Sequence, residues 1–195
     1  MKNSKISRMV GIALLMALVV VMQFVSGMIP PVGGFSISLV LIPIVLGAAA
    51  FGPSGGVILG ATFGTVVFIN CVTGTDPGGA MVFQANPVLC FFVVIGKGVL
   101  AGAGAGLVYK ALKSKNAYVA MVCAAVICPI INTGVFLAAM FAFYIDVLSA
   151  WAGGSDVIGY VLSGLVLANF VPELIINVVF TPAGHHILRI VQKNR

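Results

Sequence analysis

The sequence predicts an all-α integral membrane protein, in which a single domain over residues 1–195 forms a bundle of six transmembrane helices. Two observations lead to this fold class. The chain is 61% hydrophobic and only 7% charged, a composition that belongs to multi-pass membrane proteins. Nine of its ten basic residues lie in three short clusters outside the apolar segments, namely Lys2, Lys5, Arg8, Lys110, Lys113, Lys115, Arg189, Lys193 and Arg195.

The three basic clusters indicate the topology. Basic residues gather in cytoplasmic segments, so all three clusters should lie on the inner side of the membrane. Four apolar segments precede the middle cluster and two follow it. Because the number of segments between neighbouring clusters is even, all three clusters stay on one side, which predicts six crossings with both termini in the cytoplasm. The basic clusters also account for the net charge of +6 without nucleic acid, which we exclude as a partner.

The first three spans are expected at residues 9–29, 36–51 and 56–71. The first is an uninterrupted apolar run of the length that a crossing needs, and it carries Ala13 and Ala17 four residues apart. The second is short and contains Pro43. The third follows a Gly-Pro turn and has a glycine every four residues, at Gly56, Gly60 and Gly64. This pattern permits close helix packing.

The last three spans are expected at residues 86–109, 117–144 and 161–190. The fourth repeats the glycine spacing at Gly98, Gly102 and Gly106, the fifth is long and contains Pro129, and the sixth carries Pro172. Residues 30–35, 73–85 and 145–159 are then loops on the outer side. Trp151 lies in the last of these loops, where aromatic residues typically mark the membrane interface.

Two charged residues lie inside apolar spans, Lys97 in the fourth and Glu173 in the sixth. A charge in hydrocarbon is costly, so both should face the interior of the bundle. Asn86 precedes Lys97 by eleven residues, which places the two on nearly the same helix face about 16 Å apart. Lys97 either receives an anionic ligand or forms a structural ion pair with Glu173, and the two interpretations can hold together.

Several amides accompany the two charges. Asn169, Glu173 and Asn177 recur every four residues on one face of the sixth span. A mostly apolar interior with a few orienting polar groups is typical of a small-molecule site, although hydrogen bonds between helices would use the same residues. The candidate substrate-binding residues are Asn70, Gln84, Asn86, Lys97, Asn132, Asn169 and Glu173.

Enzymatic activity is not expected from this sequence. It contains no GxxxxGK[ST] loop, no HExxH and no GxSxG motif, and its four acidic residues are widely separated. The four cysteines have no metal-ligand spacing and should be small buried side chains. We therefore expect no catalytic residues, no metal and no cofactor.

Two segments carry a family resemblance. The run SISLVLIPIVLGAAAFGPSGGVILGATFG, followed by NPVLCFFVVIGKGVLAGAGAGLVYKAL, resembles the S component of an energy-coupling factor (ECF) transporter. The resemblance implies a high-affinity vitamin-binding subunit of the bacterial cytoplasmic membrane. Such subunits dock on a transmembrane coupling subunit that carries two cytoplasmic ATPases, and Ala13 and Ala17 would line the docking face. The outer segments 30–35 and 73–85 would act as lids.

The pattern is most similar to S components for pantothenate, a small carboxylate. The resemblance implies that Lys97 meets the carboxylate, where many relatives have an arginine, and that Gln84, Asn86 and Asn132 bind the hydroxyls and amide. Riboflavin and lipoate are the alternative substrates. A stand-alone facilitator and a membrane enzyme are the competing functions, but the Gly- and Ala-rich lower half of the fourth span opposes a polar path through the protein.

Overall fold

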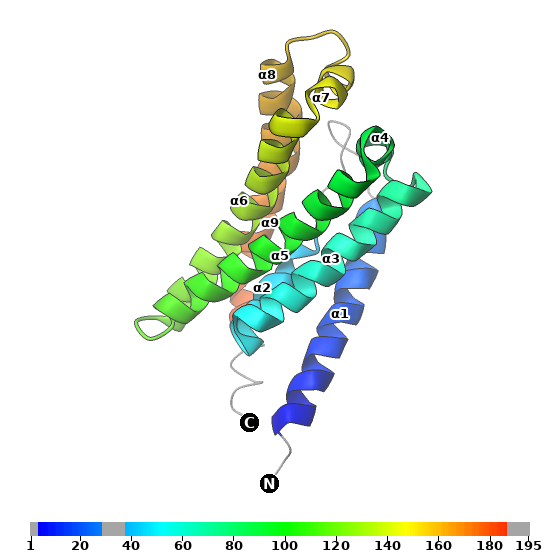
Figure 1. Cartoon of the computed structure of the whole chain (residues 1–195). Helices are drawn as coiled ribbons and strands as arrows, with labels where there is room; N and C mark the ends of the chain where they lie inside the picture. Colours follow the sequence, from blue (N-terminus) through cyan, green and yellow to red (C-terminus); the bar gives the residue numbers. More distant parts are fainter. Residues whose placement is uncertain (1–3, 29–37, 187–195) are drawn as a thin grey trace.

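The computed structural model describes residues 4–28 and 38–186, and within them the chain is helical with no strand (Figure 1). In these ranges five segments are long and apolar enough to cross a membrane, at Lys5–Met28, Pro53–Thr73, Pro87–Leu112, Ala117–Phe143 and Val157–His186. The shorter apolar helix α2 (Leu41–Phe51) has 11 residues. At about 1.5 Å per residue it covers about half of a hydrocarbon core. The all-helical class is confirmed, with five spans and one shorter helix.

The helices follow the predicted segments closely, with shifts of a few residues at their ends. The long helices are α1 (Ser4–Met28), α3 (Pro53–Thr73), α5 (Pro87–Leu112) and α6 (Ala117–Phe143). Pro53 and Pro87 stand at the first turn of α3 and α5, where the missing N–H of proline costs nothing. The start of α2 at Leu41 places Pro43 in its first turn as well. Pro129 lies inside α6 without ending it.

Two expected outer loops contain helices, so their assignment as loops is wrong. Residues 73–85 include α4 (Pro77–Ala85), which begins with a proline at its first turn. Residues 145–159 include α7 (Ile145–Ala152) and the start of α8 (Val157–Tyr160). Both short helices pack onto the bundle through buried apolar residues, among them Val82 and Leu148. The proposed lid at residues 30–35 lies outside the described residues.

The sixth predicted span changes its helical pattern halfway. It continues from α8 into a π-helical segment, η1 (Val161–Phe170), and then returns to α-helix in α9 (Val171–Val179). Pro172 stands at the first turn of α9, so the change of pattern coincides with a residue that has no amide hydrogen. A π segment is wider than an α-helix and often adjoins a functional site.

The two predicted glycine repeats pack against each other, backbone to backbone. A Cβ added at Gly60 would collide with the carbonyl oxygen of Gly98, and one added at Gly56 would collide with that of Gly102. In the same way, a Cβ added at Gly98 would collide with the carbonyl oxygen of Gly60, and one added at Gly102 with that of Gly56. A Cβ added at Gly64 would collide with the backbone of Ile95. The prediction of close helix packing along these repeats is confirmed, and the structure shows that each repeat is the other's partner.

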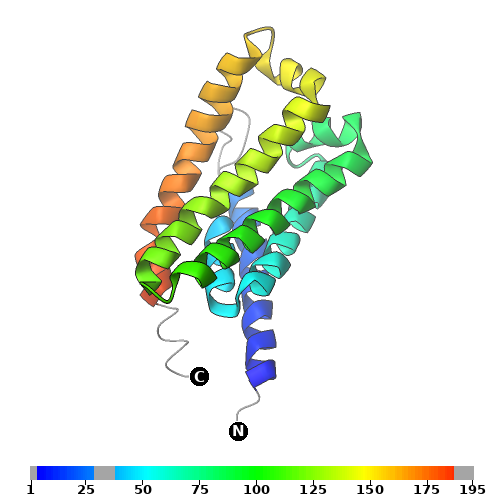
Figure 2. The same cartoon turned by 60° about the vertical axis from the view of Figure 1, so that its left-hand side comes forward.

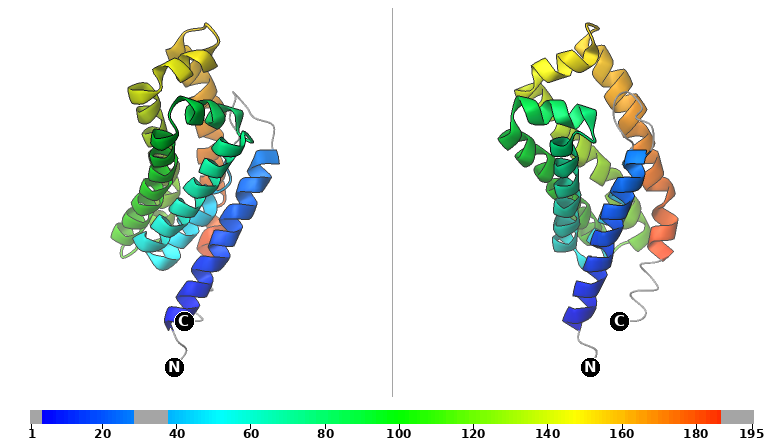
Figure 3. Two further views of the ribbon diagram at one scale, coloured as in Figure 1. Left: turned by 45° about the vertical axis from the view of Figure 1, so that its right-hand side comes forward. Right: turned by 90° about the vertical axis from the view of Figure 1, so that its right-hand side faces the viewer.

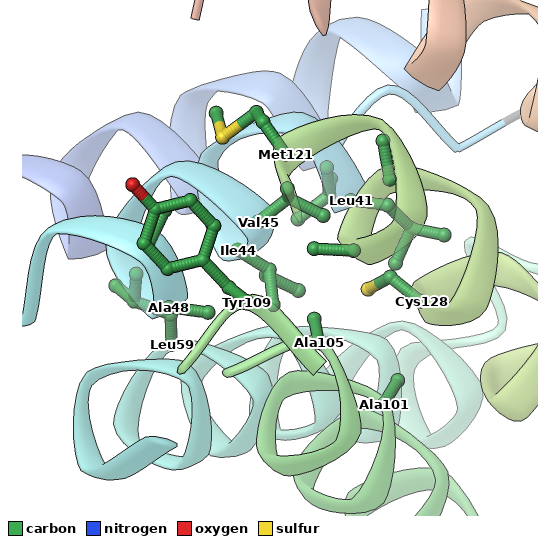
Figure 4. Packing of buried hydrophobic residues seen from close by; sticks show 14 of the residues in the cluster. Leu41, Ile44, Val45, Ala48, Leu59, Ala101, Ala105, Tyr109, Met121 and Cys128 are labelled. Carbon is green, nitrogen blue, oxygen red and sulfur yellow. The ribbon is translucent and has the colours of Figure 1, made fainter. Parts of the chain in front are cut away.

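A hydrophobic core fills the bundle around α2, α3, α5 and α6 (Figure 4). Leu41 and Ile44 of α2 pack with Ala101, Ala105 and Tyr109 of α5, and the cluster is completed by Met121 and Cys128 of α6 together with Leu59 of α3. The core therefore closes the half of the bundle that contains the turn between α5 and α6.

All four cysteines have free thiols, and three of them are buried.

The two ends of the molecule differ in charge. The start of α1, the α5–α6 turn and the end of α9 lie at one end, which we call the basic end, while α4, α7 and α8 lie at the opposite end (Figures 2 and 3). The basic end holds Lys110, Lys113 and Lys115, whereas the acidic residues Asp76, Asp146 and Asp156 belong to the segments around α4, α7 and α8. The two ends of the described chain therefore both lie at the basic end (Figures 2 and 3).

Candidate functional site

A cavity of about 130 Å³ lies between the core and the end formed by α4 and α7. It is comparable in size with protein cavities of about 150 Å³ that admit a benzene-sized molecule. Five of the seven candidate binding residues line it, and they come from α3, α5, α6, η1 and α9: Asn70, Lys97, Asn132, Asn169 and Glu173. The expected convergence of polar groups on one interior space is therefore present.

Lys97 reaches the cavity from the middle of α5 and lies against two aromatic rings. Its Nζ atom is 4.9 Å from the ring centroid of Phe136 and 5.8 Å from that of Phe63. Aromatic faces attract a cation and offset part of the cost of removing it from water. Within the described ranges no carboxylate oxygen lies within 4.0 Å of this ammonium. The cation is thus held by aromatic rings, with its hydrogen-bond donors available to the cavity.

Glu173 lines the same cavity from the first turn of α9 and is only 2% exposed. It interacts with Lys97 electrostatically across the cavity, but the two do not form a close ion pair. Asn177, one turn further on, lies beyond the cavity and donates its amide Nδ2–H to the backbone oxygen of Glu173 at 2.9 Å. The predicted polar face of the sixth span therefore contributes two residues to the cavity and one to local structure.

Three polar side chains around the cavity have a buried oxygen without a hydrogen-bond partner among the described residues. They are Gln23 through Oε1, Ser38 through Oγ and Asn132 through Oδ1. A buried polar atom left without a partner costs about 1–3 kcal/mol. Asn132 is 6% exposed, so bulk water cannot meet this demand. The cavity is therefore lined by groups that favour a ligand able to donate hydrogen bonds.

Gln84 and Asn86 do not line the cavity, so the structure does not bring these two candidate binding residues together with Lys97. Both side chains are exposed. Asn86 is the N-cap of α5, and its Oδ1 accepts a hydrogen bond from the N–H of Leu89 at 3.0 Å. The asparagine directly before Pro87 is a typical start of a helix, and this local signal explains its role better than the spacing to Lys97.

The cap of α5 is also tied to the end of α6. Tyr144 follows α6 directly, is buried, and donates its phenolic O–H to the backbone oxygen of Asn86 at 3.0 Å. Burial raises the pKa of Tyr144 to about 12, so the phenol stays protonated and keeps donating. Trp151, which was expected at the membrane interface, lines the cavity.

Sequence reasoning missed several cavity residues that come from short helices and from α1. Trp151 of α7 stacks on Phe136, with ring centroids 6.5 Å apart and planes at 23°. Asp76, just before α4, places a carboxylate on the wall, and Gln23 contributes from α1. An amide inside an otherwise apolar span was a usable signal for Gln23. Trp151 and Asp76 carried no such signal, because they lie in segments that were expected to be loops.

An apolar helical bundle whose cavity is lined by one ammonium, two carboxylates and several amides is typical of a membrane protein that binds a small molecule. Comparison with known families agrees with this class. Residues 7–183 match the family described as ECF transporter, substrate-specific component, and the chain belongs to that family. It is a multi-pass protein of the cell membrane, and its family is one of transporter components.

A relative supports the same assignment over nearly the full length. The chain is 26% identical over 193 residues to the pantothenic acid transporter PanT of Lactococcus lactis subsp. cremoris (strain MG1363), and the match covers 94% of each chain.

Proposed function

We propose that this protein is the S component that binds pantothenate for an ECF transporter. The observation that carries the proposal is the position of Lys97, whose ammonium faces the cavity between two aromatic rings without a close carboxylate. A cation in such a site favours an anionic ligand. The similarity to PanT supports pantothenate among the small carboxylates.

The cavity suits the groups of pantothenate, which carries a carboxylate, an amide and hydroxyls. Lys97 would bind the carboxylate as a point charge, because lysine lacks the two-pronged geometry of arginine. The unpartnered oxygen of Asn132 would accept a hydrogen bond from a hydroxyl or the amide N–H. Asn70 and Asn169 also line the cavity. Gln84 and Asn86, which face outside the cavity, are left out of the proposed contacts.

Riboflavin and lipoate remain the alternative substrates. Riboflavin has a large planar ring system that would need an open aromatic surface, whereas Phe136 and Trp151 already stack on each other. The cavity volume of about 130 Å³ also favours a ligand smaller than riboflavin. Lipoate shares the carboxylate but offers no amide N–H or hydroxyl to the buried oxygens, which supports pantothenate over lipoate.

We propose that transport depends on a coupling subunit and two ATPases, with the basic end and both termini in the cytoplasm. Ala13 and Ala17 are exposed on α1 and would form the docking face. A stand-alone facilitator would need a polar path to the basic end, and the hydrophobic core and the α3–α5 packing oppose one (Figure 4). Ala13→Leu and Ala17→Leu should abolish uptake but spare vitamin binding. Ala150→Leu, an exposed alanine on α7, is the control.

Trp151 provides a direct test of the substrate, because it is the one tryptophan of the chain and it lines the cavity. Purified protein in detergent is titrated with pantothenate, riboflavin or lipoate while tryptophan fluorescence is recorded. Pantothenate should change the signal at an equimolar amount, and the small molecule that copurifies with the protein should be the same vitamin. Isothermal titration of Trp151→Phe checks that the indole only reports binding. Saturable binding of riboflavin or lipoate with no response to pantothenate would overturn the assignment.

A further inference from the structure

A second cavity, of about 410 Å³, lies at the basic end. It is formed by the beginning of α1, the turn between α2 and α3, and the end of α5. Among the described residues, none that lines this cavity also lines the one that contains Lys97. Its volume falls in the range of about 300–1,000 Å³ that is usual for small-molecule sites. The basic end therefore has room for a ligand of its own.

Three cations from distant parts of the chain meet at this cavity. They are Arg8 of α1, Lys110 in the last turn of α5 and Lys113 at the C-cap of the same helix. The chain has four acidic residues, and none of them lines this cavity in the described structure. Cations that share a cavity without a carboxylate repel one another. An anionic ligand would replace this repulsion by attraction.

The guanidinium of Arg8 is anchored to the turn between α2 and α3. Its Nη2 atom donates hydrogen bonds to Oγ of Ser54 at 2.6 Å and to the backbone oxygen of Phe51 at 3.4 Å. A guanidinium has five N–H donors in one plane, so up to three of them are left for a ligand. Two such donors side by side match two oxygens of a phosphate group. The geometry of Arg8 therefore favours a phosphate over other anions.

The surface beside the cavity favours the phosphate of a membrane lipid over a phosphate in solution. Met9 and Val10 follow Arg8 directly on α1, and they are 70% and 52% exposed. A head group in the cavity can therefore continue into acyl chains that lie along apolar protein surface. Basic pockets between the helices of membrane proteins, on the side that carries the positive clusters, are typical sites for anionic lipid head groups.

We propose that this cavity binds the head group of an anionic phospholipid such as phosphatidylglycerol. Arg8 binds the phosphate oxygens through its remaining N–H donors, and Lys110 and Lys113 add positive charge around them. Phosphatidylcholine carries the same phosphate together with a cation of its own, so its head group gains less from this site. The site is separate from the cavity of Lys97, and the proposal does not depend on which vitamin that cavity binds.

The test titrates the purified full chain in a neutral detergent with phosphatidylglycerol or phosphatidylcholine of the same acyl chains, and native mass spectrometry counts the lipids retained. One phosphatidylglycerol per chain should bind in preference to phosphatidylcholine. Arg8→Gln and Lys113→Gln each remove one charge and should weaken its binding about fivefold. Lys115→Gln, an exposed lysine that does not line the cavity, is the matched control and should bind like the unmodified chain. Melting temperatures without added lipid check that the variants are folded.

A further variant tests the geometry of the site apart from its charge. Ser54→Ala keeps every cation but removes an acceptor that holds Arg8 in place. It should therefore also weaken the binding of phosphatidylglycerol, and an unchanged affinity would contradict the role of the anchored guanidinium.

Three other outcomes would overturn the proposal. Equal retention of the two lipids would show that the cavity does not select an anionic head group. An equal loss in Lys113→Gln and Lys115→Gln would assign the effect to the overall charge of the basic end and not to the cavity. Displacement of phosphatidylglycerol by an equal concentration of glycerol 3-phosphate would show that the site takes a soluble phosphate and not a lipid.

Discussion

The ammonium of Lys97 lies 4.9 Å from the ring centroid of Phe136. This contact explains how a lysine is tolerated in the middle of an apolar helix when no carboxylate lies within ion-pair distance of it in the described chain. Phe136 in turn stacks on Trp151, so the cation and the indole are linked through one phenyl ring. A change at the cation should therefore be visible in the fluorescence of the indole.

Replacement of Lys97 tests the role of the charge in binding. Lys97→Met keeps most of the side-chain volume and removes the ammonium. The affinity for an anionic vitamin should therefore fall about 10- to 100-fold, which corresponds to the free energy of one hydrogen bond to a charged group. Isothermal titration measures the change. Lys110→Met, in an exposed position at the basic end, is the matched control and should bind like the unmodified protein. Unchanged affinity in Lys97→Met would reduce this lysine to a structural role.

Glu173→Gln tests whether the carboxylate competes with the ligand for Lys97. Glu173 interacts with the ammonium across the cavity, and its neutral amide would leave the full attraction to an anionic ligand. We expect the affinity for pantothenate to rise by up to about tenfold. The affinity for an uncharged analogue in which an alcohol replaces the carboxylate should not change. A large loss of pantothenate binding would instead mean that Glu173 accepts a hydrogen bond from the substrate.

The glycine packing between α3 and α5 predicts a sharp difference between two similar substitutions. Gly60→Ala introduces a Cβ that collides with the carbonyl of Gly98, and overpacking of this kind costs about 1–3 kcal/mol. At Gly96 an added Cβ meets no described atom within 4 Å, so Gly96→Ala should gain up to about 1 kcal/mol from helix propensity. Thermal unfolding in detergent compares the two variants. Equal melting temperatures would show that α3 and α5 are not in backbone contact.

Tyr144 predicts a loss of stability in alkaline solution. Burial raises its pKa from 10.0 to about 12, so the folded state holds the phenolic proton more tightly than the unfolded state. The contribution of Tyr144 is therefore complete below about pH 10 and is lost as the pH rises through about 12.

Tyr144→Phe should remove that alkaline loss. At neutral pH it should lower stability by about 1 kcal/mol, because the hydrogen bond to the Asn86 carbonyl is gone. Thermal unfolding at several pH values measures both effects, with Tyr118→Phe, an exposed tyrosine, as control. An identical alkaline slope in Tyr144→Phe would contradict this explanation.

Much of the fold could be predicted because the bilayer restricts the choices. The apolar runs and the three basic clusters were sufficient for the helical class, and the glycine repeats indicated close packing. What the repeats could not show is that they face each other, since pairing depends on the register of two helices and not on either one alone. The short helices α4 and α7 were missed because glycine and proline indicate loops equally well.

For the candidate site, charge within apolar spans was the strongest signal. Lys97 and Glu173 were placed at the cavity because hydrocarbon admits few alternatives for a charged group. The same reasoning failed at Asn86, where the local chemistry of a helix cap decided the role. Asp76 and Trp151 reach the cavity through the packing of short helices at one end, and helical periodicity in the long spans holds no information about them.

The contact between the glycines of α3 and α5 also limits how the protein can move. With no side chains between them, the two backbones lie in direct contact. We therefore expect the pair to shift as one rigid body. Access to the chamber then depends on displacement of the elements outside this pair, among them α4, α7 and the π-helical segment η1, which makes them the places to look for motion during uptake.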